Sequence, residues 1–258
     1  MTEPTLATDV IPLSEQFDNH DAYRPEPTDA LAGRRLALHM KDGSVIDVRF
    51  DSEAQLTWSS DVEQLWGLSG TDDYEAIELR PDLYLVVIGR LEERTSLLAV
   101  LDLAHARAIL NLTRLVDDGD GVREVTTFGQ AGVGGPIGER FERTHELVGR
   151  RVHHRYSDTH AFEHIYLSHR TYAYQGLEGP EAGIADVDYT DAYKLADRLY
   201  LFSWHERAQP FNGAITLDLE AGRATGRLFG WEKETGRALQ IRTGSIATLL
   251  NETTYEGL

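Results

Sequence analysis

Cysteine is absent from the sequence, and methionine occurs only twice. The absence of cysteine excludes disulfides, thiolate zinc sites and iron–sulfur clusters, so a metal would need histidine and carboxylate ligands. Basic residues are also scarce: 25 Lys and Arg stand against 43 Asp and Glu, which gives a formal net charge of -18. Because nucleic-acid binding depends on clustered Lys and Arg, we expect no nucleic-acid partner.

Long apolar runs are lacking as well. No run approaches the roughly 20 residues that a membrane-spanning helix needs, and residues 1–20 have neither the basic start nor the apolar core of a secretory signal. We therefore expect a cytoplasmic protein with no membrane partner. The 41% content of hydrophobic residues is ordinary for a globular chain that buries one large core or two smaller ones.

The chain repeats itself without a gap. LAGRRLALHMKDG begins at Leu31, and LVGRRVHHRYSDT begins 116 residues later, at Leu147. The same offset aligns ELRPDLYLVV, from Glu78, with KLADRLYLFS, from Lys194. Similarity at one fixed offset in both halves indicates an internal duplication.

Within each copy, short runs rich in Leu, Val, Thr, Tyr and Phe alternate with turn-forming stretches such as KDGS, RPD and DDGDG. This pattern is typical of all-β proteins built from hairpins, and closing each copy into a barrel removes exposed sheet edges. The sequence therefore predicts two tandem antiparallel β-barrels. The predicted parts are a loose arm (1–29), a structural first barrel (30–128), a linker (129–146) and a ligand-binding second barrel (147–258).

Alternation along the strands predicts which side chains point into each barrel. In the first copy these are apolar: Leu36, Leu38, Met40, Ile46, Val48 and Phe50. The offset aligns these six positions with Val152, His154, Tyr156, Phe162, His164 and Tyr166. Inward positions later in the first copy align with Tyr172, Tyr174, Tyr193, Phe202, Trp204 and Glu206. A buried hydroxyl or imidazole without a partner costs roughly 1–3 kcal/mol, so we expect these polar rings to surround a cavity that holds water or ligand.

Two histidines stand out in this set. If Met40 faces Ile46 across an Asp42-Gly43-Ser44 loop, the same register places His154 opposite His164, close enough to share a proton, a water or a metal ion. Two alternatives stay open: the histidines brace the barrel through tyrosine hydroxyls, or they bind a metal with Glu206 as a third ligand. We predict no metal and no cofactor. The other nearby histidines are expected on outward or turn positions: His153, His160 and His169.

Several segments resemble a known family. SDTHAFEHIYL, YAYQGLEGPEAGIADVD, AYKLADRLYLFSWHE and ATLLNETTYEG are similar to the carboxy-terminal domain of molybdenum cofactor biosynthesis protein F, the MoaF-like family. LAGRRLALHMKDGSVIDVRF resembles the amino-terminal domain of that family. The resemblance implies calycin-like barrels, related in shape to lipocalins and phenolic acid decarboxylases.

The leading functional hypothesis is that the second barrel binds a small aromatic or conjugated molecule and performs cofactor-independent acid/base chemistry on it, as a lyase, decarboxylase or isomerase. The expected acid/base groups are His154, His164 and Glu206. The expected ligand-binding groups are Tyr156, Tyr166, Tyr172, Tyr174, Tyr193, Phe202 and Trp204.

Two other functions remain open from the sequence. One is a non-catalytic carrier or sensor with the same cavity. The other is a role in molybdenum cofactor synthesis, against which stands the absence of basic residues from the predicted inward positions. Whether the chain is an enzyme, and whether it forms a homodimer, also stays open.

Overall fold

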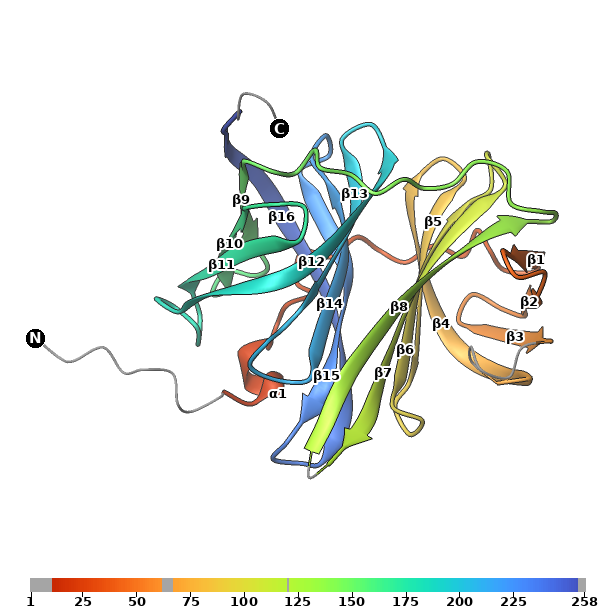
Figure 1. Ribbon diagram of the computed structural model, residues 1–258, viewed down its shortest axis with the longest axis horizontal. Coiled ribbons are helices and arrows are strands. Elements are labelled where there is room, and N and C mark those ends of the chain that lie inside the picture. Colours follow the sequence, from red (N-terminus) through yellow and green to blue (C-terminus); the bar gives the residue numbers. More distant parts are fainter. Residues whose placement is uncertain (1–10, 62–66, 120, 255–258) are drawn as a thin grey trace, which may run out of the picture.

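The computed structural model describes residues 11–61, 67–119 and 121–254, and its regular secondary structure consists almost entirely of strands (Figure 1). Eight consecutive antiparallel strands close into a first barrel, with β8 pairing back to β1. These strands are β1 (Arg35–Met40), β2 (Val45–Phe50), β3 (Gln55–Ser60), β4 (Ser69–Arg80), β5 (Leu83–Arg90), β6 (Thr95–Asp102), β7 (Arg107–Asp118) and β8 (Gly121–Val133).

A second barrel of the same topology follows, closed by pairing of its last strand with its first. The prediction of two tandem antiparallel barrels is confirmed. The strands of the second barrel are β9 (Arg150–Arg155), β10 (Ala161–Tyr166), β11 (Thr171–Glu178), β12 (Ala185–Ala196), β13 (Leu199–His205), β14 (Phe211–Asp218), β15 (Arg223–Glu232) and β16 (Arg237–Glu252).

The duplication is visible in the strand boundaries. β2 begins at residue 45 and its counterpart β10 at 161, while β4 begins at 69 and β12 at 185. The turn glycines also correspond, since Gly33 and Gly149 both have positive φ, at 79° and 85°. Equivalent turns in both copies therefore require a backbone conformation that glycine adopts without steric cost.

The hairpin register differs from the prediction by two residues. Leu38 pairs with Ile46, and the backbone N–H of Met40 donates a hydrogen bond to the carbonyl oxygen of Ser44, so the turn is centred on Asp42. In the second barrel His154 pairs with Phe162. A shift of two residues keeps every side chain on the same face of the sheet, and the inward faces of this hairpin stay as predicted.

The two barrels pack side by side through their outward faces (Figure 1). β5 and β13 are therefore buried on both sides, which explains their nearly continuous apolar runs LYLVVI and LYLFSW. The interface also contains the fully buried Arg227, which donates hydrogen bonds to Asn111 Oδ1 at 2.6 Å and Thr113 Oγ1 at 2.8 Å of the first barrel. Arg80 and Asp218 form an ion pair between the barrels.

Residues 11–29, which belong to the predicted loose arm, pack against both barrels. The short helix α1 (Leu13–Gln16) lies on the second barrel, and Thr28 donates a backbone hydrogen bond to Ala76 of the first. The segment predicted as a linker at 129–146 starts inside a strand, because β8 continues to Val133. Residues 1–10 lie outside the described part of the chain.

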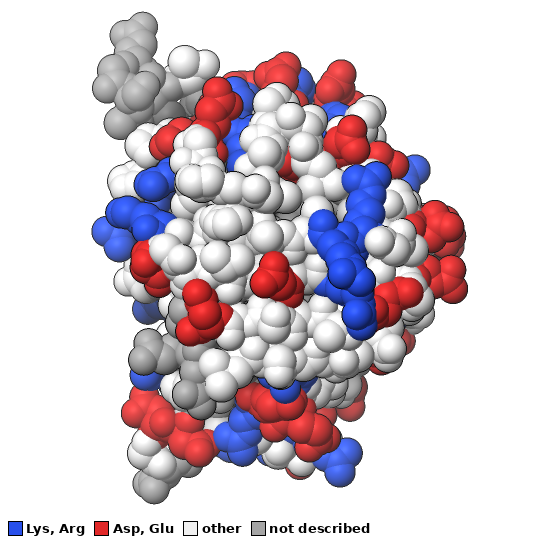
Figure 2. Space-filling view, turned by 90° about the vertical axis from the view of Figure 1, so that its right-hand side faces the viewer, with Lys and Arg blue, Asp and Glu red and all other residues white. Residues whose placement is uncertain are grey.

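The surface that the first barrel presents in Figure 2 has a largely uncharged centre. Acidic groups gather toward its edges, and basic side chains form one short strip and scattered spots. The described residues contain no helix of sufficient length and hydrophobicity to cross a bilayer.

Candidate functional site

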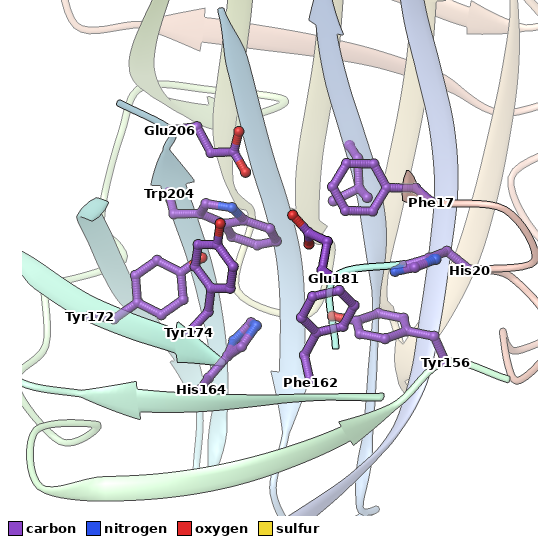
Figure 3. A pocket seen from close by; sticks show the side chains of 11 residues that line it. Phe17, His20, Tyr156, Phe162, His164, Tyr172, Tyr174, Glu181, Trp204 and Glu206 are labelled. Carbon is purple, nitrogen blue, oxygen red and sulfur yellow. The ribbon is translucent and has the colours of Figure 1, made fainter. Parts of the chain in front are cut away.

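A cavity lies inside the second barrel, walled mainly by aromatic rings (Figure 3). Its volume is about 30 Å³, which accommodates about two water molecules. The lining residues come from seven strands or loops of the barrel and from the segment after α1: Phe17, His20, Tyr156, Phe162, His164, Tyr172, Tyr174, Glu181, Trp204, Glu206 and Leu228.

The structure brings six of the predicted site residues to this cavity: Tyr156, His164, Tyr172, Tyr174, Trp204 and Glu206. Tyr166 and Phe202 pack in the surrounding core of the barrel, and their rings are 5.0 Å apart. His154 is fully buried beside the cavity without lining it.

Tyr193 lies elsewhere, contrary to the predicted inward position. Its ring packs against Phe128 of the first barrel, at 5.0 Å, within the apolar cluster between the barrels. The neighbouring Ala192 belongs to the inner core instead. On β12 the outward face is buried by the other barrel, so hydrophobicity alone does not distinguish the two faces.

His154 and His164 form a close pair of neutral imidazoles. Their ring centroids are 4.3 Å apart, and His154 Nδ1 hydrogen bonds to Ser245 Oγ at 2.9 Å. Desolvation by burial lowers the pKa of His164 to about 3 and the pKa of His154 well below its ordinary value. Both rings are therefore uncharged at neutral pH, which does not favour the predicted acid/base role of the two histidines.

Glu206 is the cavity group that titrates near neutrality. Desolvation raises the pKa of its carboxyl group to about 8, a hydrogen bond from Gln209 opposes the rise, and the carboxylates of Asp188 and Glu181 add to it. Glu206 as a whole residue is partly exposed, but its carboxyl group faces the cavity (Figure 3). Burial of the carboxyl group therefore accounts for its raised pKa. At pH 7 this carboxyl group is mostly protonated.

The large side chain of Trp204 is accommodated because its cross-strand neighbour is a glycine, whereas the first barrel has two medium-sized side chains at the equivalent positions. It pairs across the sheet with Gly213, whose counterparts in the first barrel are the paired Ile88 and Leu97. A Cβ atom on Gly213 would approach the indole ring of Trp204 to 2.1 Å. The glycine therefore makes room for a large ring against the barrel wall.

Sequence reasoning missed the contribution of the N-terminal segment. Phe17 stacks on Phe211 at 5.2 Å, and His20 stacks on Tyr156 at 4.4 Å, so both rings close the cavity on one side (Figure 3). Gln16 Nε2 donates to Glu181 Oε1 at 2.6 Å. The repeat has no counterpart for this segment, and comparison of the copies gave no signal for it.

Two more buried polar groups near the cavity were not identified from the sequence. Asp188 on β12 is 2% exposed, pairs with Tyr172 across the sheet and has no partner for its Oδ2 atom. His160, predicted to face solvent or brace a loop, is 7% exposed, with Nδ1 bonded to Thr159 Oγ1 at 3.0 Å and its ring 5.3 Å from His20. Of the other two histidines, His153 is half-buried and His169 is exposed.

The site shows no arrangement of ligands for a metal ion. In the described parts of the chain, no three His, Asp or Glu side chains are grouped closely enough to coordinate one. His154, His164 and Glu206 are therefore not arranged as a three-ligand set.

The first barrel also contains a cavity, of about 70 Å³. Its lining is apolar, as predicted for this barrel, and includes Leu38, Val48, Trp58 and Leu110. The indole N–H of Trp58 is satisfied by Asp72 Oδ2 at 2.7 Å. The two barrels thus share a topology and differ in the chemistry of their interiors.

Comparison with known proteins agrees with this two-part architecture. The family model "MoaF N-terminal domain" matches residues 9–117, and "MoaF C-terminal domain" matches residues 141–253. The curated Protein MoaF of Klebsiella aerogenes is 28% identical over 240 residues, which cover 87% of this chain and 88% of that protein.

Among solved structures, a "putative beta-lactamase" of Burkholderia vietnamiensis aligns at 18% identity with a TM-score of 0.35, covering 43% of this chain and 100% of that one. That likeness is too low to bear on fold or function. The two domain models together span most of the sequence in the order of the two barrels, and the chain belongs to the MoaF family.

Proposed function

We propose that the second barrel binds a small molecule with an aromatic or conjugated group and transfers a proton to or from it through Glu206. The proposal depends on one observation: a carboxyl group with a pKa of about 8 opens on a cavity walled by aromatic rings. A general acid or base works best when its pKa lies near the working pH, and Glu206 meets this condition.

The remaining polar groups have supporting roles in this proposal. His164 is a neutral imidazole with no partner for Nδ1, so it can donate or accept one hydrogen bond to a ligand, depending on its tautomer. The ring of Trp204 lies 5.7 Å from His164 and offers a flat apolar surface. His154 is held in place by its hydrogen bond to Ser245, and its ring packs against the ring of His164 on the side away from the cavity.

Ligand entry requires the N-terminal segment to move. A cavity that takes one benzene molecule measures on the order of 150 Å³, several times the volume present. Phe17 and His20 are the lining residues that do not belong to the barrel itself. We propose that they move outward when the ligand enters and close over it afterwards.

Solvent exchange tests proton transfer without knowledge of the product. Aryl ketones, arylalkylamines and cinnamate-like acids would be incubated with the protein in D2O, and deuterium incorporation at carbon would be followed by NMR. We expect Glu206→Gln to bind the responsive compound and to lose exchange by at least about tenfold. Glu163→Gln is the matched control, because Glu163 is paired with Arg151 outside the cavity. Binding without exchange by the wild-type protein would favour a carrier.

Family membership supports a role in molybdenum cofactor synthesis as a second candidate. A phosphorylated pterin would need basic partners, and none of the described residues that line the cavity is Lys or Arg. We therefore expect deletion of the gene to leave the host's molybdenum enzymes active. Loss of their activity, restored by the intact gene, would favour this candidate.

A further inference from the structure

We infer that the ligand of the second barrel is an organic cation, a protonated or quaternary amine joined to an aromatic or conjugated group. This inference rests on the proposed function and specifies its ligand class.

The wall of the cavity suits a cation. Six of its lining side chains are Phe, Tyr or Trp, and Tyr172 and Trp204 lie with ring centroids 5.9 Å apart. The negative face of an aromatic ring attracts a cation within about 6 Å, most strongly in a desolvated site, and groups of such rings recognise amines and quaternary ammonium ions. An anionic ligand would meet the same faces unfavourably.

The cavity also contains two acidic groups without a matching cation. Glu181 and Glu206 point toward the same space in Figure 3. Their partners are amides: Gln16 donates to Glu181 at 2.6 Å, and Gln209 bonds to Glu206. No described residue of the cavity wall is Lys or Arg. Arg207 contacts Asp188, beside the cavity, through its backbone N–H at 3.2 Å.

Buried carboxyl groups without a cation are costly to ionise, and in this site protonation removes the cost. The pKa of Glu181 is raised by desolvation, and the pKa of Glu206 is raised to about 8. A bound ammonium group would replace the proton as the compensating charge. A cation therefore gains electrostatic energy at this site that a neutral ligand does not.

An unpartnered imidazole gives independent support. His164 is 3% exposed, lines the cavity and has no hydrogen-bond partner for Nδ1. As a neutral ring it can accept a hydrogen bond from an N–H group of a protonated amine. The net charge of -18 also attracts cations toward the protein and repels anions.

Three probes of similar shape distinguish the effect of ligand charge on binding from the effect of ligand shape: benzylamine, benzyl alcohol and phenylacetate. Isothermal titration of the full chain at pH 7 is expected to show benzylamine binding at least about tenfold more tightly than benzyl alcohol, with phenylacetate weakest. Benzylamine binding should also release a proton, because the cation lowers the pKa of Glu206. This release is measured by repeating the titration in buffers of different ionisation enthalpy.

Variants locate the effect. Glu206→Gln is expected to reduce benzylamine affinity at least about tenfold and to leave benzyl alcohol affinity unchanged, while Glu163→Gln changes neither. Thermal unfolding confirms that each variant folds, and Glu181→Gln provides the same comparison should Glu206→Gln unfold. Equal or tighter binding of benzyl alcohol or phenylacetate by the wild-type protein would overturn the inference and leave the proposed binding function intact. Failure of all three probes to bind would overturn the proposed function itself.

Discussion

The imidazole rings of His154 and His164 lie 4.3 Å apart although the two residues are not paired across the sheet. His154 pairs with Phe162, and His164 pairs with Val152. The rings therefore meet diagonally, at a separation of two residues, within reach of long and aromatic side chains. Only the ring of His164 lines the cavity, so we expect the two histidines to contribute differently to stability and to ligand binding.

Replacement of each histidine by phenylalanine is expected to have unequal effects on stability. His154→Phe removes the bond to Ser245 and leaves its buried hydroxyl unpartnered, which should lower the free energy of unfolding by about 1–3 kcal/mol. His164→Phe removes a nitrogen that has no partner, next to free volume, and should change it by less than about 1 kcal/mol. Urea unfolding measures the free energy of unfolding of both variants. A larger loss for His164→Phe than for His154→Phe would contradict the different roles inferred for the two histidines.

Gly213→Ala is expected to displace Trp204 from the cavity wall. The added Cβ atom would lie 2.1 Å from the indole ring, and such overpacking costs about 1–3 kcal/mol. Gly135→Ala is the control, because no atom lies within 4 Å of its added Cβ. Denaturant unfolding and tryptophan fluorescence report the two effects. Similar behaviour of both variants would show that Trp204 tolerates the added carbon atom.

Stability should depend on pH through Glu206. Its folded-state pKa of about 8 lies above the ordinary 4.5, so the folded state holds a proton that the unfolded state has released. The contribution is fully present below pH 4.5 and is lost as the pH rises through 8. The stability of the wild-type protein relative to Glu206→Gln should therefore fall between these values and become constant above them. Urea midpoints across this range provide the test, and a constant difference would contradict the shift.

A cross-link that holds the N-terminal segment in place should prevent ligand entry. Ser14 Oγ and Thr235 Oγ1 both bond to the carboxylate of Glu232, at 2.5 and 2.8 Å, and both residues are exposed. Because the chain has no cysteine, Ser14→Cys/Thr235→Cys can be joined specifically by a short bis-maleimide.

We expect the cross-linked protein to lose at least about tenfold in benzylamine association rate, because entry requires the segment to move. The same double variant without the cross-linker, and each single variant after labelling, should retain the rate. Unchanged uptake by the cross-linked form would show that the ligand enters by another route.

The repeat and the period-two pattern were sufficient to predict both barrels and most inward faces. An error of two residues in register leaves each side chain on the same face of the sheet. His164 was therefore correctly predicted to point inward, although the hairpin register in both barrels differs by two residues from the predicted one. Tyr193 was misplaced because its strand is buried on both sides, by the core of its own barrel and by the other barrel. Burial of this kind depends on packing between distant segments.

The electrostatic character of the site could not be read from residue types. From ordinary pKa values His164 is the group that titrates near neutrality, whereas desolvation lowers its pKa to about 3 and raises that of Glu206 to about 8. The contribution of Phe17 and His20 was also hidden, because these residues precede the repeat and meet the cavity only in three dimensions.

The position of a bound, heavy-atom-labelled cation tests the account most directly. A crystal of the protein soaked with 4-bromobenzylamine would reveal the bromine by its anomalous signal. We expect one peak inside the second barrel, with the ring of the ligand in contact, at about 4 Å, with that of Trp204, and its ammonium group toward Glu181 and Glu206. A peak in the apolar cavity of the first barrel, or an ammonium group pointing away from both carboxyl groups, would contradict the account.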